Sequence, residues 1–560
     1  AFLQKKYGED VALTIQQDSS LKSGFQLHVG SEVYDWSAKG RMEQFRQQVE
    51  QLVAKNTRKD IIPLLRSSID EFRLLAKSSE VGTVKSIGDG IAVVEGLEHA
   101  AYGEILMFDN GIKGMVQDLR RNETGCILFD NADDISAGSK VARTGKTAGV
   151  PVGDAFLGRV VDALGRPIDG GDAIPADGYR PVEEPAPGII DRQSVDTPME
   201  TGLLSIDAMF PIGRGQRELI IGDRQTGKTA IALDAMLNQK GKNVICVYVA
   251  IGQKASSVAQ LVENLRKRDA MDYCVVVSAT AGEADTMQYI APYAGCAMAE
   301  YYMHKGRDVL IVYDDLSKHA IAYRAMSLLL ERAPGREAYP GDVFYLHSRL
   351  LERSAHLSDK LGGGSMTALP IVETQAGDVS AYIPTNIISI TDGQIFLESD
   401  LFFAGQRPAV NVGLSVSRVG GAAQTKATKK ATGSLRLDLA QYREMEVFTQ
   451  FSSDLDDSTK EQLHYGQGLM RILRQKQYHP LSMHQQVIVL VCAMGHVLSK
   501  VAVKDVTDFR DALLDHFEQE HSDLCRSLED EKVLTDDMKQ EILRIAEEYL
   551  AANAERFRKE

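Results

Sequence analysis

The chain has 560 residues, too many for a single hydrophobic core, so its length predicts three or four domains. A hydrophobic fraction of 44% and a charged fraction of 25% are ordinary for a globular protein. The net charge of −15 argues against wholesale binding of nucleic acid, although an acidic average is compatible with a local basic channel. The six cysteines are scattered without a C-x-x-C pair, which indicates a reduced protein without a disulfide framework.

Residues 1–53 are expected to form a small α+β segment. Apolar side chains alternate over residues 25–29, which predicts a strand, and they recur at helical spacing over residues 42–52. A polar break follows, and residues 54–80 are expected to form a linker and an amphipathic helix.

Three further domains are expected along the chain. In residues 81–149 short apolar runs are cut by Gly and Asp, a pattern typical of a small β-barrel. In residues 150–425 strands alternate with helices, which predicts an α/β domain with a parallel sheet. Residues 426–560 are helical in pattern and are expected to form a C-terminal α-helical bundle. The fold class is therefore multidomain.

A phosphate-binding loop is predicted at residues 222–229, which fit G-x-x-x-x-G-K-[ST]. A short apolar run precedes this stretch and a helical pattern follows it, which is the context that such a loop requires. Backbone N–H groups and the helix N-terminus would bind phosphate, and an accidental Gly-rich turn is the alternative. The residues are Gly222, Asp223, Arg224, Gln225, Thr226, Gly227, Lys228 and Thr229. Lys228 would reach the β- and γ-phosphates of a nucleoside triphosphate, and the Thr229 hydroxyl would bind Mg²⁺.

Two residues at the ends of predicted strands bear on the chemistry. Asp314 closes an apolar run at 309–313, and an acid at the end of a strand beside the P-loop strand would hold Mg²⁺, directly or through water. The alternative is that Asp314 caps the following helix. Gln253 follows another apolar run, where an ATPase could carry a carboxylate; an amide cannot act as a general base, although it can orient water.

An arginine that acts on a neighbouring subunit is a further hypothesis. The small-residue stretch 407–420 at the far edge of the α/β domain contains Arg418, and an arginine here could project outward into a neighbour's nucleotide site. An ordinary surface arginine fits the pattern equally well.

These motifs together resemble the alpha subunits of the F-type rotary ATP synthase. The resemblance runs from about residue 61 to the C-terminus, and the stretches that carry it are residues 213–229, 248–254, 311–318, 334–342 and 408–417. It implies a RecA-like P-loop domain in a hexamer of alternating alpha and beta subunits around a gamma shaft, with loop 334–342 facing the shaft. It also implies that the chain binds ATP and Mg²⁺ through Thr229 and Asp314 without turning the ATP over, since Gln253 replaces the catalytic glutamate of beta.

The resemblance further implies roles for individual residues. Arg418 would be the finger that reaches into the catalytic site of beta, and Ser389 would lie close to that interface. The residues around the adenine would be Arg407, Pro408, Gln475 and Gln477.

Residues 1–53 depart from a usual alpha subunit and resemble the C-terminal end of the delta subunit. A natural fusion of a stator element to alpha is one interpretation, and a degenerate extension is the other. In a fusion this segment would pack near the N-terminal barrels. Delta and b stator subunits are expected partners, and the chain is expected on the cytoplasmic side of a bacterial membrane, or the inner face of an organelle, held there only by its complex.

A catalytically active hexameric ATPase, of the export or RNA-helicase kind, is the alternative. Such an enzyme should carry a carboxylate at position 253, and a helicase should carry basic and aromatic RNA contacts, which the net charge of −15 does not favour.

Overall fold

The computed structural model describes residues 14–16, 24–29, 32–35, 37, 42, 78–109, 111–129, 135–449 and 456–557. The chain divides into two compact units, Ala1–Thr147 and Ala148–Glu560. Each unit has its own hydrophobic core. The predicted amphipathic helix within 54–80 and most of the predicted helix over 42–52 lie outside the described residues.

A closed antiparallel barrel forms most of the described part of the first unit, as the sequence predicted. Its strands follow one another in the order β3-β4-β7-β6-β5-β8, and β3 pairs with β8 to close the barrel. The strands are β3 (Ser78–Gly88), β4 (Ile91–Glu95), β5 (Glu104–Phe108), β6 (Lys113–Leu119), β7 (Glu123–Leu128) and β8 (Lys140–Thr147). Inward-facing side chains such as Val94, Leu106 and Val116 fill the interior, because alternate residues of a strand face one side.

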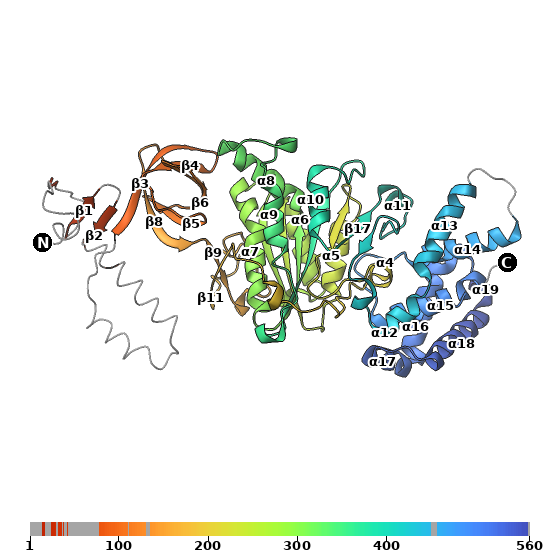
Figure 1. Cartoon of the computed structure of the whole chain (residues 1–560). Helices are drawn as coiled ribbons and strands as arrows, with labels where there is room; N and C mark the ends of the chain where they lie inside the picture. The colour runs from red at the N-terminus through yellow and green to blue at the C-terminus, as the bar shows by residue number, and fades with distance from the viewer. Residues whose placement is uncertain are drawn as a thin grey trace, which may run out of the picture. The chain divides into compact units, whose positions relative to one another are not determined.

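A short hairpin precedes the barrel and pairs with it (Figure 1). Strands β1 (Gln26–Val29) and β2 (Glu32–Asp35) are antiparallel, and β2 pairs with the first residues of β3. Residues 78–80, expected at the end of the linker, form the start of β3 instead. This overhang of β3 offers backbone hydrogen-bonding groups to β2, so the segment before the barrel extends its sheet.

The α/β part of the second unit contains one sheet of strand order β10-β14-β13-β15-β16-β12-β17-β18, in which only the pairing of β17 with β18 is antiparallel. A small two-stranded sheet, β9 (Gly149–Val152) with β11 (Gly178–Pro181), precedes it. The strands of the main sheet are β10 (Val160–Val161), β12 (Leu219–Gly222), β13 (Val244–Gln253), β14 (Cys274–Thr280), β15 (Asp308–Asp314), β16 (Ser365–Glu373), β17 (Gly393–Leu397) and β18 (Val416–Ser417). The apolar runs that precede the phosphate loop, Gln253 and Asp314 coincide with the buried strands β12, β13 and β15, as expected for strands covered on both faces.

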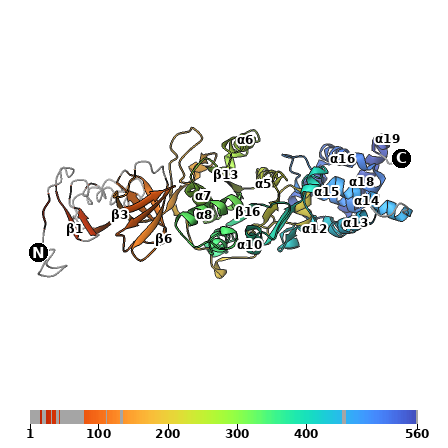
Figure 2. The same cartoon turned by 90° about the horizontal axis from the view of Figure 1, so that it is seen from above.

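Helices cover both faces of this sheet (Figures 1 and 2). The main ones are α5 (Lys228–Leu237), α6 (Ala255–Arg266), α7 (Asp285–Met303), α8 (Leu316–Leu329), α9 (Val343–Leu351) and α10 (Tyr382–Ile390). Val258 of α6 joins the core cluster of Tyr248, whereas Gly295 of α7 lies against Val249, whose side chain points to the opposite face. A Cβ at Gly295 would lie 2.4 Å from a Val249 methyl, so glycine lets α7 approach the sheet closely.

The C-terminal part of the second unit is helical, as predicted. Its main helices are α12 (Lys426–Thr432), α13 (Leu435–Thr449), α14 (Asp457–Ile472), α15 (Met483–Met494), α16 (Val506–Glu520), α17 (Ser522–Glu531) and α18 (Asp536–Ala552). Thr535 caps α18, where it accepts a hydrogen bond from the N–H of Met538 at 3.1 Å. In the described part of the chain no helix is long and apolar enough to span a bilayer. All six cysteines are free and buried. Their scattered positions in the sequence had indicated a protein without a disulfide framework.

Candidate nucleotide site

The predicted phosphate loop lies between a buried strand and a helix. Strand β12 ends at Gly222 and α5 begins at Lys228, with Gly227 in the left-handed region (φ 96°) as the N-cap. The first N–H groups of α5 therefore have no helical partner and point out of the helix end, where an anion can accept from them. The Lys228 ammonium donates to the carbonyls of Gly222 (2.9 Å) and Asp223 (2.5 Å). Burial lowers the pKa of Lys228, and nearby carboxylates including Glu373 and Asp315 oppose this shift.

Three side chains converge where a metal ion is expected. The Thr229 hydroxyl donates a 2.6 Å hydrogen bond to Oδ2 of Asp314, and the Tyr248 hydroxyl donates another of 2.6 Å to the same oxygen. Burial, followed by the charge of Asp314, raises the pKa of Tyr248, so the phenol keeps its proton as a donor. The pair that the sequence assigned to Mg²⁺ is thus in direct contact.

Two details of this region differ from expectation. The strand of Asp314, β15, is not beside the P-loop strand, because β16 lies between them. The acid that caps α8 is Asp315, which accepts from the N–H of Lys318 at 2.8 Å, so the capping alternative for Asp314 was wrong. Burial, with the charge of Asp314 adding to it, raises the pKa of Asp315 to about 6.

A cavity of about 1050 Å³ opens beside the phosphate loop. The predicted residues that line it are Arg224, Gln225, Thr226, Gly227, Lys228, Thr229, Gln253, Asp314, Arg407, Pro408, Gln475 and Gln477. Gly222 and Asp223 do not line it. The Asp223 carboxylate accepts hydrogen bonds from the hydroxyls of Thr374 (2.6 Å) and Ser399 (3.0 Å), which indicates a role in holding the loop.

Basic side chains gather around this cavity. They are Arg224, Lys228, Lys254, Lys318, Arg407, Arg474 and Lys476. A triphosphate carries several negative charges, so this distribution favours such a ligand over a neutral one.

The other end of the cavity has the features of a site for a planar ring. The Arg407 guanidinium lies 4.3 Å from the ring centre of Phe402, and Pro408 lines the wall beside them. The Gln475 amide donates to the carbonyl of Gly202 at 2.6 Å, and the Gln475 backbone N–H donates to the carbonyl of Arg407 at 2.9 Å. Gln475 therefore anchors this wall, whereas Gln477 is exposed at its edge.

Gln253 lies at the carboxyl end of β13. Its amide nitrogen donates to the backbone carbonyl of Asp314 at 3.1 Å and to the Tyr248 hydroxyl at 3.3 Å. The position that could hold a carboxylate thus holds an amide. That amide is hydrogen-bonded to the backbone of Asp314, whose side chain is the expected metal ligand.

Sequence reasoning missed several residues of the cavity lining, among them Asp315, Glu373, Phe402 and Tyr478. Glu373 ends β16 and pairs with Arg224 at 3.1 Å. Its position at the end of a buried apolar run was the available signal, the same one that identified Asp314.

Arg418 and Ser389 lie apart from the cavity lining. Arg418 follows the edge strand β18 and is exposed, and its backbone N–H donates to the carbonyl of Asp392 at 2.9 Å. Ser389 is exposed near the end of α10 and donates to the carbonyl of Asn386 at 2.7 Å. Both side chains are therefore accessible on this chain rather than part of its own site.

Comparison with known proteins agrees with this geometry. Residues 202–417 match the model of the ATP synthase alpha/beta family nucleotide-binding domain, and residues 77–145 and 424–549 match the beta-barrel and C-terminal domains of that family. ATP synthase subunit alpha of Clostridium botulinum (strain Hall) is 58% identical over 483 residues, which cover 86% of this chain and 96% of that protein. The protein of the same name from Clostridium kluyveri (strain NBRC 12016) is 56% identical over 490 residues, 88% of this chain and 97% of that protein. The chain belongs to the family of ATP synthase alpha subunits.

One further match lies outside the alpha/beta-family domains. Residues 1–49 match the model of the ATP synthase delta (OSCP) subunit. The hairpin β1–β2 lies within this match, and it pairs with the barrel of the alpha-subunit part of the chain. The resemblance of the N-terminal segment to delta is thereby confirmed.

Proposed function

We propose that this alpha subunit holds Mg-ATP without hydrolysing it and supplies Arg418 to a catalytic site on an adjacent beta subunit. The observation that carries the proposal is the hydrogen bond from the Gln253 amide to the carbonyl of Asp314, because it puts a non-basic group beside the expected metal ligand. The proposed assembly is an alternating hexamer with beta around a gamma shaft, bound to delta and b stator subunits and peripheral to the membrane.

The residues present fit Mg²⁺ and ATP. Thr229 and Asp314 present a hydroxyl and a carboxylate within 2.6 Å of each other, and Mg²⁺ prefers such hard oxygen ligands. The ion would supply charge neutralisation for the phosphates. Lys228 would exchange its bonds to the loop carbonyls for phosphate oxygens, while Arg407, Pro408 and Gln475 hold the base.

The absence of a base at position 253 supports a site that retains its nucleotide. Gln253 can orient a water molecule but cannot accept its proton. Its amide is also committed to the carbonyl of Asp314 and to Tyr248. Bound nucleotide would then stabilise the subunit by mass action rather than turn over.

Arg418 has the properties of a residue that acts on a neighbour. Its side chain is exposed at the sheet edge, while the hydrogen bond from its backbone N–H to the carbonyl of Asp392 fixes the backbone from which that side chain extends. A guanidinium delivered to a transferring phosphoryl group is worth roughly 10³–10⁵ in rate. Ser389 is proposed to lie close to the same interface.

The test is Arg418→Lys in the assembled complex. ATP turnover should fall by roughly 10³-fold or more, because lysine lacks the forked donors of arginine. The nucleotide content of the alpha sites should be unchanged. Arg544→Lys, at a pair exposed on α18, is the matched control and should keep full turnover. Full turnover in the Arg418 variant would overturn the proposal.

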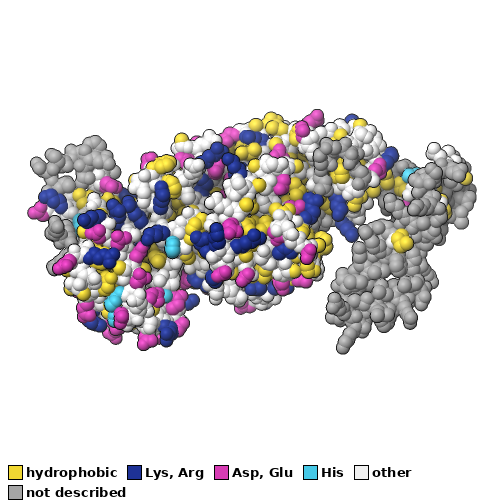
Figure 3. Space-filling view, turned by 180° about the vertical axis from the view of Figure 1, so that it is seen from behind, with side chains coloured by type: hydrophobic (Ala, Val, Ile, Leu, Met, Phe, Trp, Pro, Cys, Tyr) yellow, Lys and Arg dark blue, Asp and Glu magenta, His cyan; other side chains and the backbone are white. Residues whose placement is uncertain are grey.

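Glu373 favours a second candidate, a self-sufficient ATPase of the export or RNA-helicase class. It is a carboxylate at a strand end in the cavity and could serve as a base in place of residue 253. Its pairing with Arg224 argues for a positioning role. For a helicase, the face in Figure 3 shows Lys and Arg interspersed with Asp and Glu rather than gathered into a basic stripe. ATP hydrolysis at enzyme-like rates by the isolated wild-type chain would favour the second candidate.

A further inference from the structure

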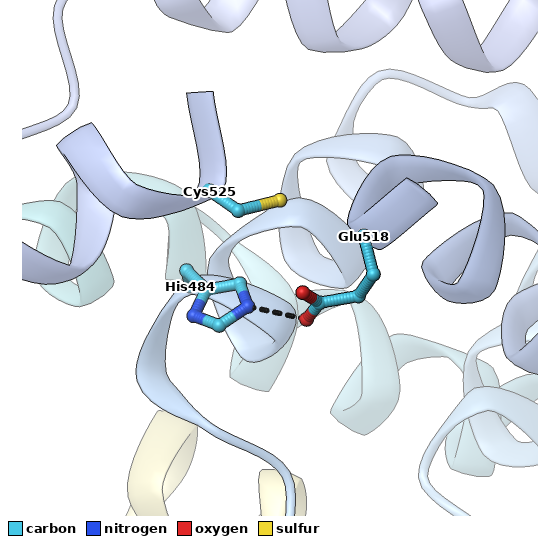
Figure 4. Close-up of side chains that lie close together, drawn as sticks. All are labelled: His484, Glu518 and Cys525. Atoms are coloured by element: carbon cyan, nitrogen blue, oxygen red, sulfur yellow. Dashed lines mark hydrogen bonds and ion pairs between the residues drawn. The ribbon is translucent and has the colours of Figure 1, made fainter. Parts of the chain in front are cut away.

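A cluster of three different metal-ligating side chains lies in the C-terminal helical part, where the nucleotide chemistry makes no use of it (Figure 4). His484 belongs to the first turn of α15, Glu518 to the last turns of α16, and Cys525 to the first turns of α17. The cluster therefore joins three helices.

The three side chains converge on one point. One ligand atom from each lies within 4.8 Å of the other two, and Nε2 of His484 is 2.7 Å from Oε1 of Glu518. Cys525 is only 4% exposed, and its thiol makes a long 3.6 Å contact to the carbonyl of Phe517. A nitrogen, an oxygen and a sulfur thus face a common space.

A fourth side chain orients the imidazole. Oε2 of Glu529 lies 2.9 Å from Nδ1 of His484 and also accepts from the backbone N–H of His484 at 3.1 Å. A carboxylate on the far nitrogen of a ligating histidine fixes the ring and increases the basicity of the nitrogen that binds metal. Glu529 therefore directs Nε2 toward Glu518 and Cys525.

We propose that His484, Glu518 and Cys525 bind one thiophilic divalent transition-metal ion, with zinc as the expected occupant. A thiolate, an imidazole and a carboxylate are the ligand types that zinc accepts, and a water molecule would complete four-coordination. Hard ions such as Mg²⁺ and Ca²⁺ disfavour sulfur, so the donor set selects against them.

Binding is an exchange of protons for metal. The Cys525 thiol is buried, and a metal ion binds a cysteine as its thiolate. On binding, the ion displaces the thiol proton and any proton on the ligating nitrogen of His484, and these protons leave to solvent. Side-chain rotation of Glu518 is enough to open its short contact with His484, because its side chain is 43% exposed.

An ion-pair clamp is the competing account. His484 between Glu518 and Glu529 would form such a clamp without metal, and it would need no sulfur. The cysteine therefore separates the two accounts. Cys525→Ser leaves every carboxylate–imidazole contact in place and removes only the thiolate.

The experiment uses the full chain, stripped of metal by a chelator and free of nucleotide, titrated with Zn²⁺ and, for its spectrum, with Co²⁺. We expect one equivalent bound and a thiolate-to-cobalt charge-transfer band in the near ultraviolet. Cys525→Ser should abolish the band and weaken zinc binding by at least 100-fold, while Glu529→Gln should weaken it by roughly 10–100-fold. The midpoint of thermal unfolding should rise with zinc in the wild type and not in Cys525→Ser.

Two controls separate this site from others. Cys492→Ala removes a different buried cysteine, which lies on α15 outside the cluster, and this variant should keep the cobalt band. Asp314→Asn disables the expected magnesium site and should also keep it, so the outcome is independent of the proposed nucleotide chemistry. Absence of the band in the wild type, or zinc binding unchanged by Cys525→Ser, would overturn the proposal and leave the ion-pair clamp.

Discussion

The amide of Gln253 and the backbone carbonyl of Asp314 are joined by a 3.1 Å hydrogen bond between the ends of two neighbouring strands. Strands β13 and β15 pair in parallel up to Ala250 and Asp314, so the bond continues the contact beyond the last paired residues. The residue that distinguishes this site from one with a general base therefore also fixes the backbone at the expected metal ligand.

Gln253→Glu should weaken Mg-ATP binding to the isolated chain. A carboxylate cannot donate to the Asp314 carbonyl, so the backbone at the expected metal ligand is less well fixed, and its negative charge repels the phosphates. Together these effects should lower the affinity by roughly 5- to 150-fold, equivalent to about 1–3 kcal/mol. Equilibrium titration with a fluorescent ATP analogue measures the change. Gln260→Glu, a cavity-lining site on α6, makes the same charge change, and equal losses in both variants would show that charge alone is responsible.

Thr229→Val should make ATP binding insensitive to magnesium. The substitution keeps the side-chain shape but removes the hydroxyl that lies 2.6 Å from Asp314. Affinity for ATP with Mg²⁺ should fall by roughly 10- to 100-fold, while affinity measured with excess chelator should change little. Thr229→Ser restores the hydroxyl and should restore the magnesium dependence. A Val variant that still responds to Mg²⁺ would contradict the assignment of Thr229.

Asp234→Asn should stabilise the nucleotide-free chain at high pH. Burial raises the pKa of Asp234 to about 6, above the ordinary value of 3.8, so the folded state binds the proton more tightly. Its contribution to stability is present below pH 4 and is lost as pH rises through 6. The midpoint of thermal unfolding of the variant, relative to wild type, should be higher at pH 8 than at pH 4.5. A difference independent of pH would contradict a raised pKa. In the wild-type chain the backbone N–H of Tyr478 donates to the Asp234 carboxylate at 2.8 Å, and the side-chain oxygen of asparagine can accept the same hydrogen bond.

Glu300→Gln should lower the stability of the second unit strongly. Glu300 and Arg353 are both almost fully buried and share hydrogen bonds of 2.6 and 2.7 Å. Removing one charge leaves the other without a counter-ion in the interior, at a cost of about 3–5 kcal/mol. Glu547→Gln breaks an exposed pair with Lys500 and should cost less than about 1 kcal/mol. Chemical denaturation followed by circular dichroism measures both, and similar shifts for the two variants would refute the argument.

Local patterns predicted the parts of the site that are continuous in sequence. The phosphate loop needs only a strand, glycines and a helix in succession, and the structure has β12, Gly227 and α5 in that order. Asp314 was predictable because a charge directly after a buried apolar run must lie at the end of the strand.

The order of strands in the sheet was not predictable in this way. The insertion of β16 between β12 and β15 depends on how distant segments pack, and periodicity carries no information about it. The apolar run before Glu373 placed it at a strand end, but its contact with Arg224 was not predictable, since only the insertion of β16 brings that strand end beside the phosphate loop. Phe402 and Tyr478 come from segments with no motif, and the fold alone brings them to the cavity.

The pairing of β2 with β3 has a consequence for counting in any assembly that contains this chain. A separate subunit can be recruited in a number of its own, whereas a hairpin continuous with the barrel is present as often as the barrel itself. Every copy of the alpha-subunit part therefore brings one delta-like strand pair, which is already paired with the sheet of the barrel. Because the delta-like and alpha-subunit parts share one polypeptide, their ratio is fixed at one to one.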